Sequence, residues 1–170
     1  SKPDGVGSNE SYRFFWTPET PIGLRTILSN TGAYQPGGDK TVAWQPVGGT
    51  WYHIAFTYSD ALDELKFYVD GTQQGATQSV TIGTLFDNAK PICLACTSAS
   101  STPVDFFDGT ITEVRVWNTI RTATELNDNK SVELLGTESG LQAYWPFEAL
   151  DVTAVAIAPE RNRALWWFDE

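Results

Sequence analysis

Acidic side chains are the first place to look for chemistry, because a retaining glycosidase needs two carboxyl groups about 5–5.5 Å apart. Alternate positions of one strand would place two carboxylates on the same face. Here Glu113 is followed on its face by Arg115, and Asp105 and Asp108 are three positions apart, hence on opposite faces of an extended chain. The other acidic cluster, 60–64, lies in a predicted strand connection. The sequence therefore predicts no enzyme, and glycoside hydrolysis is the least favoured function.

The single histidine and the two cysteines are the other candidates for catalysis or metal binding. His53 alternates with apolar neighbours, which predicts a packed or hydrogen-bonded strand residue. Cys93 and Cys96 would be about 10 Å apart in an extended strand, beyond the limit of roughly 7 Å for a disulfide. Two buried thiols are therefore favoured, and a local disulfide remains open if the chain turns at residues 94–95. Zinc would need more Cys or His ligands than the chain supplies.

The composition excludes several classes of protein. Of the 170 residues, 41% are hydrophobic and only 19% are charged, which excludes a disordered chain. No run of 18 apolar residues occurs, so no membrane insertion is expected. The net charge of −10 argues against nucleic acid and anionic membranes as partners. Methionine is absent, even at position 1, which predicts a processed chain or a fragment of a longer protein, organised as one domain over 1–170.

Alternating apolar residues predict short strands along most of the chain. In the segment 51–59, Tyr52, Ile54, Phe56 and Tyr58 form one strongly apolar face. Asp70-Gly71 supplies a tight turn, because both residues tolerate positive φ. The predicted strands are 11–17, 25–29, 41–45, 51–59, 65–69, 77–82, 91–96, 110–117, 141–147 and 164–168. About ten strands separated by turns indicate an all-β sandwich of two antiparallel sheets.

One segment breaks this strand pattern. Thr122 and Glu125 are spaced as a capping box, in which each side chain accepts a hydrogen bond from the other residue's backbone N–H. Few apolar residues follow. The sequence therefore predicts one short, superficial helix near residues 122–128.

Four strings together resemble the laminin-G-like and pentraxin-like branch of the concanavalin A-like jelly rolls. They are WYHIA at 51–55, YVDG at 68–71, FDGTITEVRVWN at 107–118 and LQAYWPF at 141–147. The resemblance covers roughly residues 10–150. It implies a two-sheet jelly roll with a concave face and a rim of loops that often carries Ca²⁺ and ligand. Large aromatic residues within these strands are expected to fill the core, namely Trp51, Phe67, Trp117 and Trp145.

The resemblance also implies a position for calcium. Asp39 precedes an early strand in the family's place for a ligand loop, and Asp105 lies in the facing loop, which lacks the family's usual acidic cluster. Ca²⁺ prefers six to eight oxygens, so these two carboxylates, with Asn30 and backbone carbonyls, would make a single weak site. The alternative is that Asp39 and Asp105 are ordinary turn residues.

Sugar binding needs exposed aromatic rings, because the C–H face of a sugar packs on a ring while its hydroxyls bind polar groups. The candidate platforms are Trp44, near the same rim, and the adjacent pair Trp166 and Trp167, one of which must point outward from a strand. Strand packing or an interface with a neighbouring protein is the alternative for all three.

These observations predict a non-catalytic recognition or adhesion module that binds glycan or protein through its rim loops or concave sheet. An extracellular or surface-exposed location follows from the same resemblance. A structural or decoration module in a larger assembly, such as a fibre, envelope or virus particle, is the alternative. Exposed rim tryptophans with calcium would favour the first, and a large apolar patch covered by another subunit would favour the second.

Overall fold

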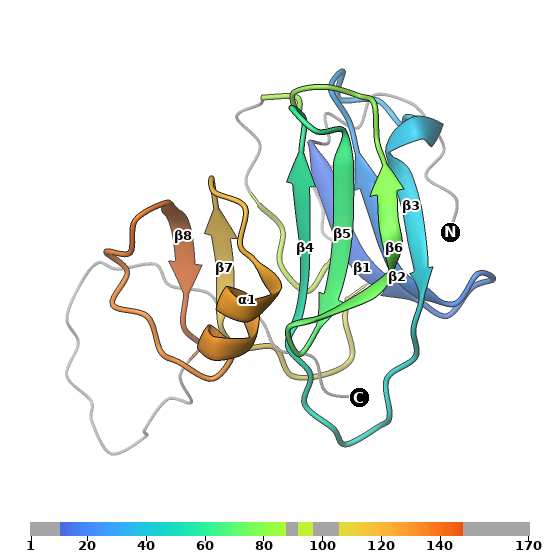
Figure 1. The fold of residues 1–170 in the computed structure, drawn as a ribbon. Coiled ribbons are helices and arrows are strands. Elements are labelled where there is room, and N and C mark those ends of the chain that lie inside the picture. Colours follow the sequence, from blue (N-terminus) through green and yellow to red (C-terminus); the bar gives the residue numbers. More distant parts are fainter. Residues whose placement is uncertain (1–10, 88–91, 97–105, 148–170) are drawn as a thin grey trace, which may run out of the picture.

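The computed structural model describes residues 11–87, 92–96 and 106–147, and most of its elements are strands in antiparallel sheets (Figure 1). The first sheet has the order β1-β2-β3, and the second has the order β4-β5-β6. Their bounds are Tyr12–Thr17, Gly23–Leu28 and Asp39–Ala43 for the first sheet and Ile54–Ser59, Glu64–Val69 and Thr72–Ser79 for the second. A short 3-10 turn, η1 (Pro36–Gly38), leads into β3. The predicted antiparallel β-sandwich is confirmed.

The apolar core lies between these two sheets. Leu24 and Leu28 from β2 meet Leu65 and Phe67 from β5, and all four side chains have no exposed surface. The apolar face predicted for β4 packs against this cluster through Tyr52, Ile54, Phe56 and Tyr58, as the alternation requires. Phe14 of β1 extends the contact, with its ring centroid 5.1 Å from that of Phe56.

A second unit lies beside β4 in Figure 1 and consists of β7 (Val114–Trp117), β8 (Leu141–Trp145) and α1 (Ala123–Asn129). We call it the hairpin unit. The predicted helix begins with the predicted capping box, because Glu125 N donates to Thr122 Oγ1 at 3.2 Å and Thr122 N donates to Glu125 Oε2 at 2.8 Å. α1 packs on the turn between β5 and β6, where Gly71 has φ +77° and a Cβ would collide with Asn127.

The segment around the cysteines differs from the prediction. Residues 92–96 form no strand, and Cys93 and Cys96 form a disulfide with their Cα atoms 5.9 Å apart. The chain turns at Ala95, which has φ 55°, and this turn shortens the separation that an extended strand would impose. The favoured interpretation as two thiols was therefore wrong. The predicted strand 164–168 lies outside the described residues.

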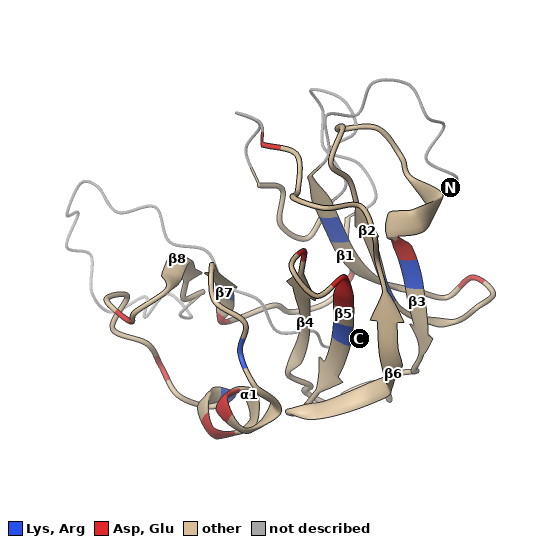
Figure 2. Cartoon of the chain, turned by 45° about the horizontal axis from the view of Figure 1, so that its top comes forward, with Lys and Arg blue, Asp and Glu red and all other residues tan. Residues whose placement is uncertain are grey.

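Charged residues are distributed unevenly over the described elements (Figure 2). Acidic and basic side chains lie on β5 and acidic ones on α1, whereas β6 and the long connection from β3 to β4 have no charged side chains. Within the described residues, no helix is long and apolar enough to cross a membrane.

Candidate functional site

The connection from β3 to β4, residues 44–53, forms one end of the sandwich, at the bottom of Figure 1. Pairing of Ala43 with Gly23 places the connection 18–22 beside it, and pairing of Ile54 with Val69 places the turn 70–71 there too. We call this end, formed by residues 18–22, 44–53 and 70–71, the aromatic rim. It brings together segments from both sheets.

Three half-buried aromatic residues anchor the long connection to the sandwich. Trp44 and Tyr52 meet edge to face with their ring centroids 5.1 Å apart, and both rings pack against the core. Trp16 Nε1 donates to the carbonyl of Trp44 at 3.4 Å, and Val47 N donates to the hydroxyl of Tyr52 at 3.3 Å. Trp44, predicted as an exposed platform, thus supports the loop from beneath. A direct contact between Trp44 and a ligand stays a prediction.

Trp51 is the exposed tryptophan of this rim. Its side chain is 45% exposed, although the sequence predicts a core position for it. The prediction was wrong because β4 begins only at Ile54, so Trp51 still belongs to the connection. The Gly48-Gly49 pair just before it was the signal that the strand had not yet started. Val47 (65% exposed) and Ile22 (40% exposed) place further apolar surface on the same rim.

His53 closes the base of the connection against the turn 70–71. Its backbone N–H donates to Asp70 Oδ1 at 3.0 Å, and its carbonyl accepts from Asp70 N at 2.7 Å. Burial, reinforced by the positive charge of Arg115 and opposed by Asp70, lowers the pKa of His53 to about 4. The imidazole is therefore neutral near pH 7 and adds no charge to the rim.

The predicted calcium ligand Asp39 lies at the opposite end of β3 from the aromatic rim. Arg25 Nε donates to its Oδ1 at 2.8 Å, Arg25 Nη2 to its Oδ2 at 2.5 Å, and the hydroxyl of Tyr34 to the same Oδ2 at 2.7 Å. Burial alone would raise the pKa of Asp39, but the hydrogen bonds from Arg25 and Tyr34 outweigh it and hold the pKa below its usual value. Both oxygens of this carboxylate are thus already engaged.

Asn30, the third predicted ligand, is also held by neighbours. Its amide oxygen accepts from Gln35 Nε2 at 2.8 Å, and its Nδ2 donates to the carbonyl of Ile82. Over the described part of the chain, no three His, Cys, Asp or Glu side chains converge on one point. Asp39 and Asn30 by themselves supply too few oxygens for Ca²⁺, which prefers six to eight. Asp105 lies outside the described residues, so the paired site stays a prediction.

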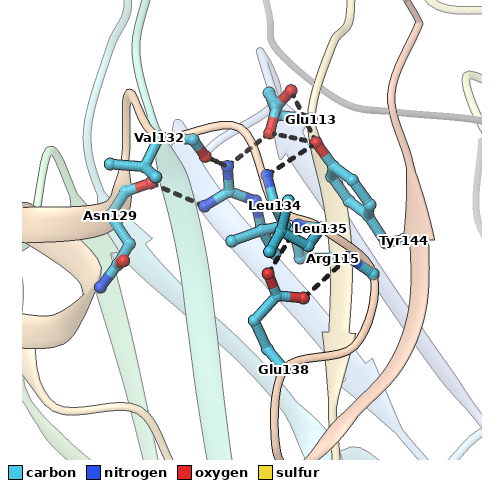
Figure 3. A network of polar contacts seen from close by, with 9 residues as sticks. Glu113, Arg115, Asn129, Val132, Leu134, Leu135, Glu138 and Tyr144 are labelled. Carbon is cyan, nitrogen blue, oxygen red and sulfur yellow. Dashed lines mark hydrogen bonds and ion pairs between the residues drawn. The ribbon is translucent and has the colours of Figure 1, made fainter.

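Glu113, the acid examined for glycosidase chemistry, belongs to a polar network in the hairpin unit (Figure 3). Its carboxylate pairs with the guanidinium of Arg115 and accepts from the hydroxyl of Tyr144 at 3.1 Å. Arg115 also donates to the carbonyl of Asn129 at 2.7 Å and to that of Val132. The network fastens the end of α1 to β7 and β8, which is a structural use of this carboxylate.

A shallow hollow of about 360 Å³ lies between β8 and residues 133–136, beside this network. Glu138 orders its edge by accepting from Leu135 N at 2.6 Å and Gly136 N at 2.9 Å. The hydroxyl of Tyr144, on its wall, accepts from Leu134 N at 3.1 Å and donates to Glu113. The polar groups shown here are already bonded within the protein, which makes the hollow a weaker candidate than the aromatic rim. Trp166 and Trp167 lie outside the described residues.

The two antiparallel sheets define a β-sandwich, and comparison with known proteins agrees. Residues 2–127 match the family described as the concanavalin A-like lectin/glucanases superfamily, of laminin-G type. The chain belongs to this family, as the four strings indicated.

A solved structure has the same fold. It is a proposed carbohydrate-binding protein from Bacteroides ovatus ATCC 8483, which is similar to this chain with a TM-score of 0.57 and 22% sequence identity. The match covers 83% of this chain and 42% of that one, so this chain spans less than half the length of that protein.

Proposed function

We propose that this protein is a non-catalytic carbohydrate-binding module, with Trp51 as the ring on which a sugar packs. The observation that carries the proposal is the exposed Trp51 side chain on a connection whose anchors, Trp44 and Tyr52, are packed on the core. A platform fixed in this way loses little conformational freedom when a ligand binds. Membership of a lectin-containing superfamily and the similarity to a proposed carbohydrate-binding protein support the same assignment.

The rim supplies both kinds of contact that a sugar needs. The Trp51 ring and the neighbouring Val47 offer apolar surface to the C–H face of a pyranose. Gln45 and Thr50, both exposed on the same connection, offer an amide and a hydroxyl to its hydroxyl groups. Glu113 is engaged by Arg115 and Tyr144, which supports a binding role without hydrolysis.

An extracellular or surface-exposed location forms part of the proposal. The Cys93–Cys96 disulfide supports it, because disulfides persist mainly in oxidising compartments. Protein partners and membership of a larger assembly stay predictions.

The test is binding of the wild type and of Trp51→Ala to an array of neutral and acidic oligosaccharides, followed by calorimetric titration of the strongest ligand. Loss of the ring should weaken binding at least tenfold, since burial of a large apolar side chain contributes about 1.5–3 kcal/mol. Phe106→Ala is the matched control, because Phe106 is 73% exposed and lies outside the rim. Unchanged affinity in Trp51→Ala, or an equal loss in Phe106→Ala, would contradict the proposal.

A further inference from the structure

The aromatic rim is almost free of charge, in a protein whose net charge is −10. The connections 18–22 and 44–53 contain no lysine or arginine, and Glu19 is their one acidic residue. His53 has its pKa lowered to about 4, so it contributes no positive charge near pH 7. In Figure 2, segment 44–53 accordingly has neither the blue of Lys and Arg nor the red of Asp and Glu. Among the residues that the structure describes, the rim segments around Trp51 therefore offer a ligand hydrogen bonds and apolar contact, and no lysine or arginine.

In the described ranges 11–87, 92–96 and 106–147, the two basic residues that act on the base of the rim are already bonded within the hairpin unit and its flanking residues. Arg115 and Lys130 are the basic residues whose charges act on His53 at the base of the rim. The Arg115 side chain is 8% exposed and its guanidinium is paired with Glu113. Lys130 Nζ donates to Asn127 Oδ1 at 3.1 Å, next to the exposed carboxylate of Asp128. The turn of the rim itself adds the acid Asp70.

We infer that the ligand of the aromatic rim is a neutral glycan, without carboxylate, sulfate or phosphate groups. This inference rests on the proposed function and narrows it to one class of sugar. Recognition of an anionic group normally uses arginine or lysine. An anion that is buried without such a partner loses its hydration free energy and gains no ion pair in return. The protein's own negative charge adds repulsion that is strongest at low ionic strength.

The first experiment compares neutral oligosaccharides with their sulfated and uronic-acid counterparts of equal length, by calorimetric titration of the wild type. Neutral ligands should bind with an affinity that changes less than about twofold between low and high salt, because no ion pair contributes. The acidic counterparts should bind at least tenfold more weakly, with the deficit largest at low salt. Acidic glycan bound as tightly as neutral glycan, and lost in Trp51→Ala, would overturn the inference while leaving the proposed function intact.

The second experiment adds a cation to the rim. Thr50→Lys, adjacent to Trp51, should raise the affinity for sulfated oligosaccharides relative to that for neutral ones at least fivefold at low salt. Ser79→Lys is the matched control, since Ser79 is exposed at the far end of β6 from the rim, and it should have no such effect. Equal gains in both variants would overturn the inference. If no glycan of either class binds the wild type, the proposed function itself fails, and the inference with it.

Discussion

The sandwich and the hairpin unit are held together by different forces. In the sandwich, the side chains at the centre are apolar, and Leu24, Leu28, Leu65 and Phe67 have no exposed surface. In the hairpin unit, a nearly buried guanidinium occupies the centre, and Arg115 binds a carboxylate and two backbone carbonyls. An apolar core yields gradually to small changes of volume, whereas a buried polar network fails when one member is left without partners. The two units should therefore respond differently to substitution.

Phe67→Ala should have the largest effect, because Phe67 is fully buried between the two sheets. Loss of the ring removes its burial and leaves a cavity, so the free energy of unfolding should fall by about 3–5 kcal/mol. Urea denaturation measures this, with Phe106→Ala as the control at a position that is 73% exposed. Equal losses in the two variants would contradict the packing described here.

Arg115→Met should lower the free energy of unfolding by about 3 kcal/mol, because the largely buried Glu113 carboxylate would lose its only charged partner shown here and keep the neutral hydroxyl of Tyr144. The double variant Glu113→Gln with Arg115→Met removes both charges and should recover at least about 1 kcal/mol of that loss. Strict additivity of the two substitutions would mean that the pair contributes nothing, and that the hairpin unit is held by apolar contacts after all.

His53 connects the two units. Its backbone N–H donates to Asp70 of the sandwich, and the positive charges of Arg115 in the hairpin unit and of Lys130 just after α1 lower its pKa. Its imidazole stays neutral in the folded protein down to about pH 4, whereas the unfolded chain binds that proton near pH 6.5. Stability should therefore fall as the pH decreases from 6.5 towards 4, by up to about 3 kcal/mol. Urea midpoints of wild type and His53→Gln should diverge over this range, and parallel curves would contradict the burial of His53.

Trp44→Ala should lower the free energy of unfolding by about 2 kcal/mol, because the half-buried ring packs on both Tyr52 and the core. Trp51→Ala should cost less than about 1 kcal/mol, because its ring is 45% exposed. Thermal denaturation of the two variants side by side tests the assignment of anchor and platform. A larger loss of stability in Trp51→Ala than in Trp44→Ala would make Trp51 the anchor and Trp44 the platform.

Calcium should have the smallest effect. If Asp39 and Asp105 share an ion, it must compete with the positive charge of Arg25 for Asp39, so binding is weak. A tenfold excess over Kd would add about 1.4 kcal/mol of stability. Arg25→Gln frees the carboxylate, so the calcium-dependent increment in melting temperature should grow in that variant. Identical melting in calcium and in EDTA, for both proteins, would contradict the predicted site.

Local patterns in the sequence predicted much of the fold. The apolar face of β4 and the capping box of α1 depend on residues two to four positions apart, and both were confirmed. The exposure of Trp51 was missed because the alternating pattern of β4 continues into the preceding connection. Trp51 and Tyr52 of that connection are aromatic and were therefore assigned to the strand. The disulfide was the less favoured alternative for a similar reason, since extended geometry was assumed where Ala95 turns the chain.

The polar network of the hairpin unit depends on distant pairs. Glu113 and Tyr144 are separated by 31 positions, and no local pattern relates them. Pairing of β7 with β8 brings them together, and that pairing follows from the tertiary fold. The structural partners of this carboxylate were therefore not visible in the sequence.

The tip of the 44–53 connection has a consequence for how such domains diversify. Gly49 has positive φ and open space where a Cβ would stand, whereas Trp44 and Tyr52, on either side of the tip, are fixed to the core. Gly49 itself is kept by its positive φ, which strains other residues. Residues can be inserted between the two anchors at little cost in folding free energy, because lengthening a surface loop costs only about 0.6 kcal/mol per doubling. Ligand preference can therefore diverge between descendants of one ancestral domain while the sandwich beneath it stays the same.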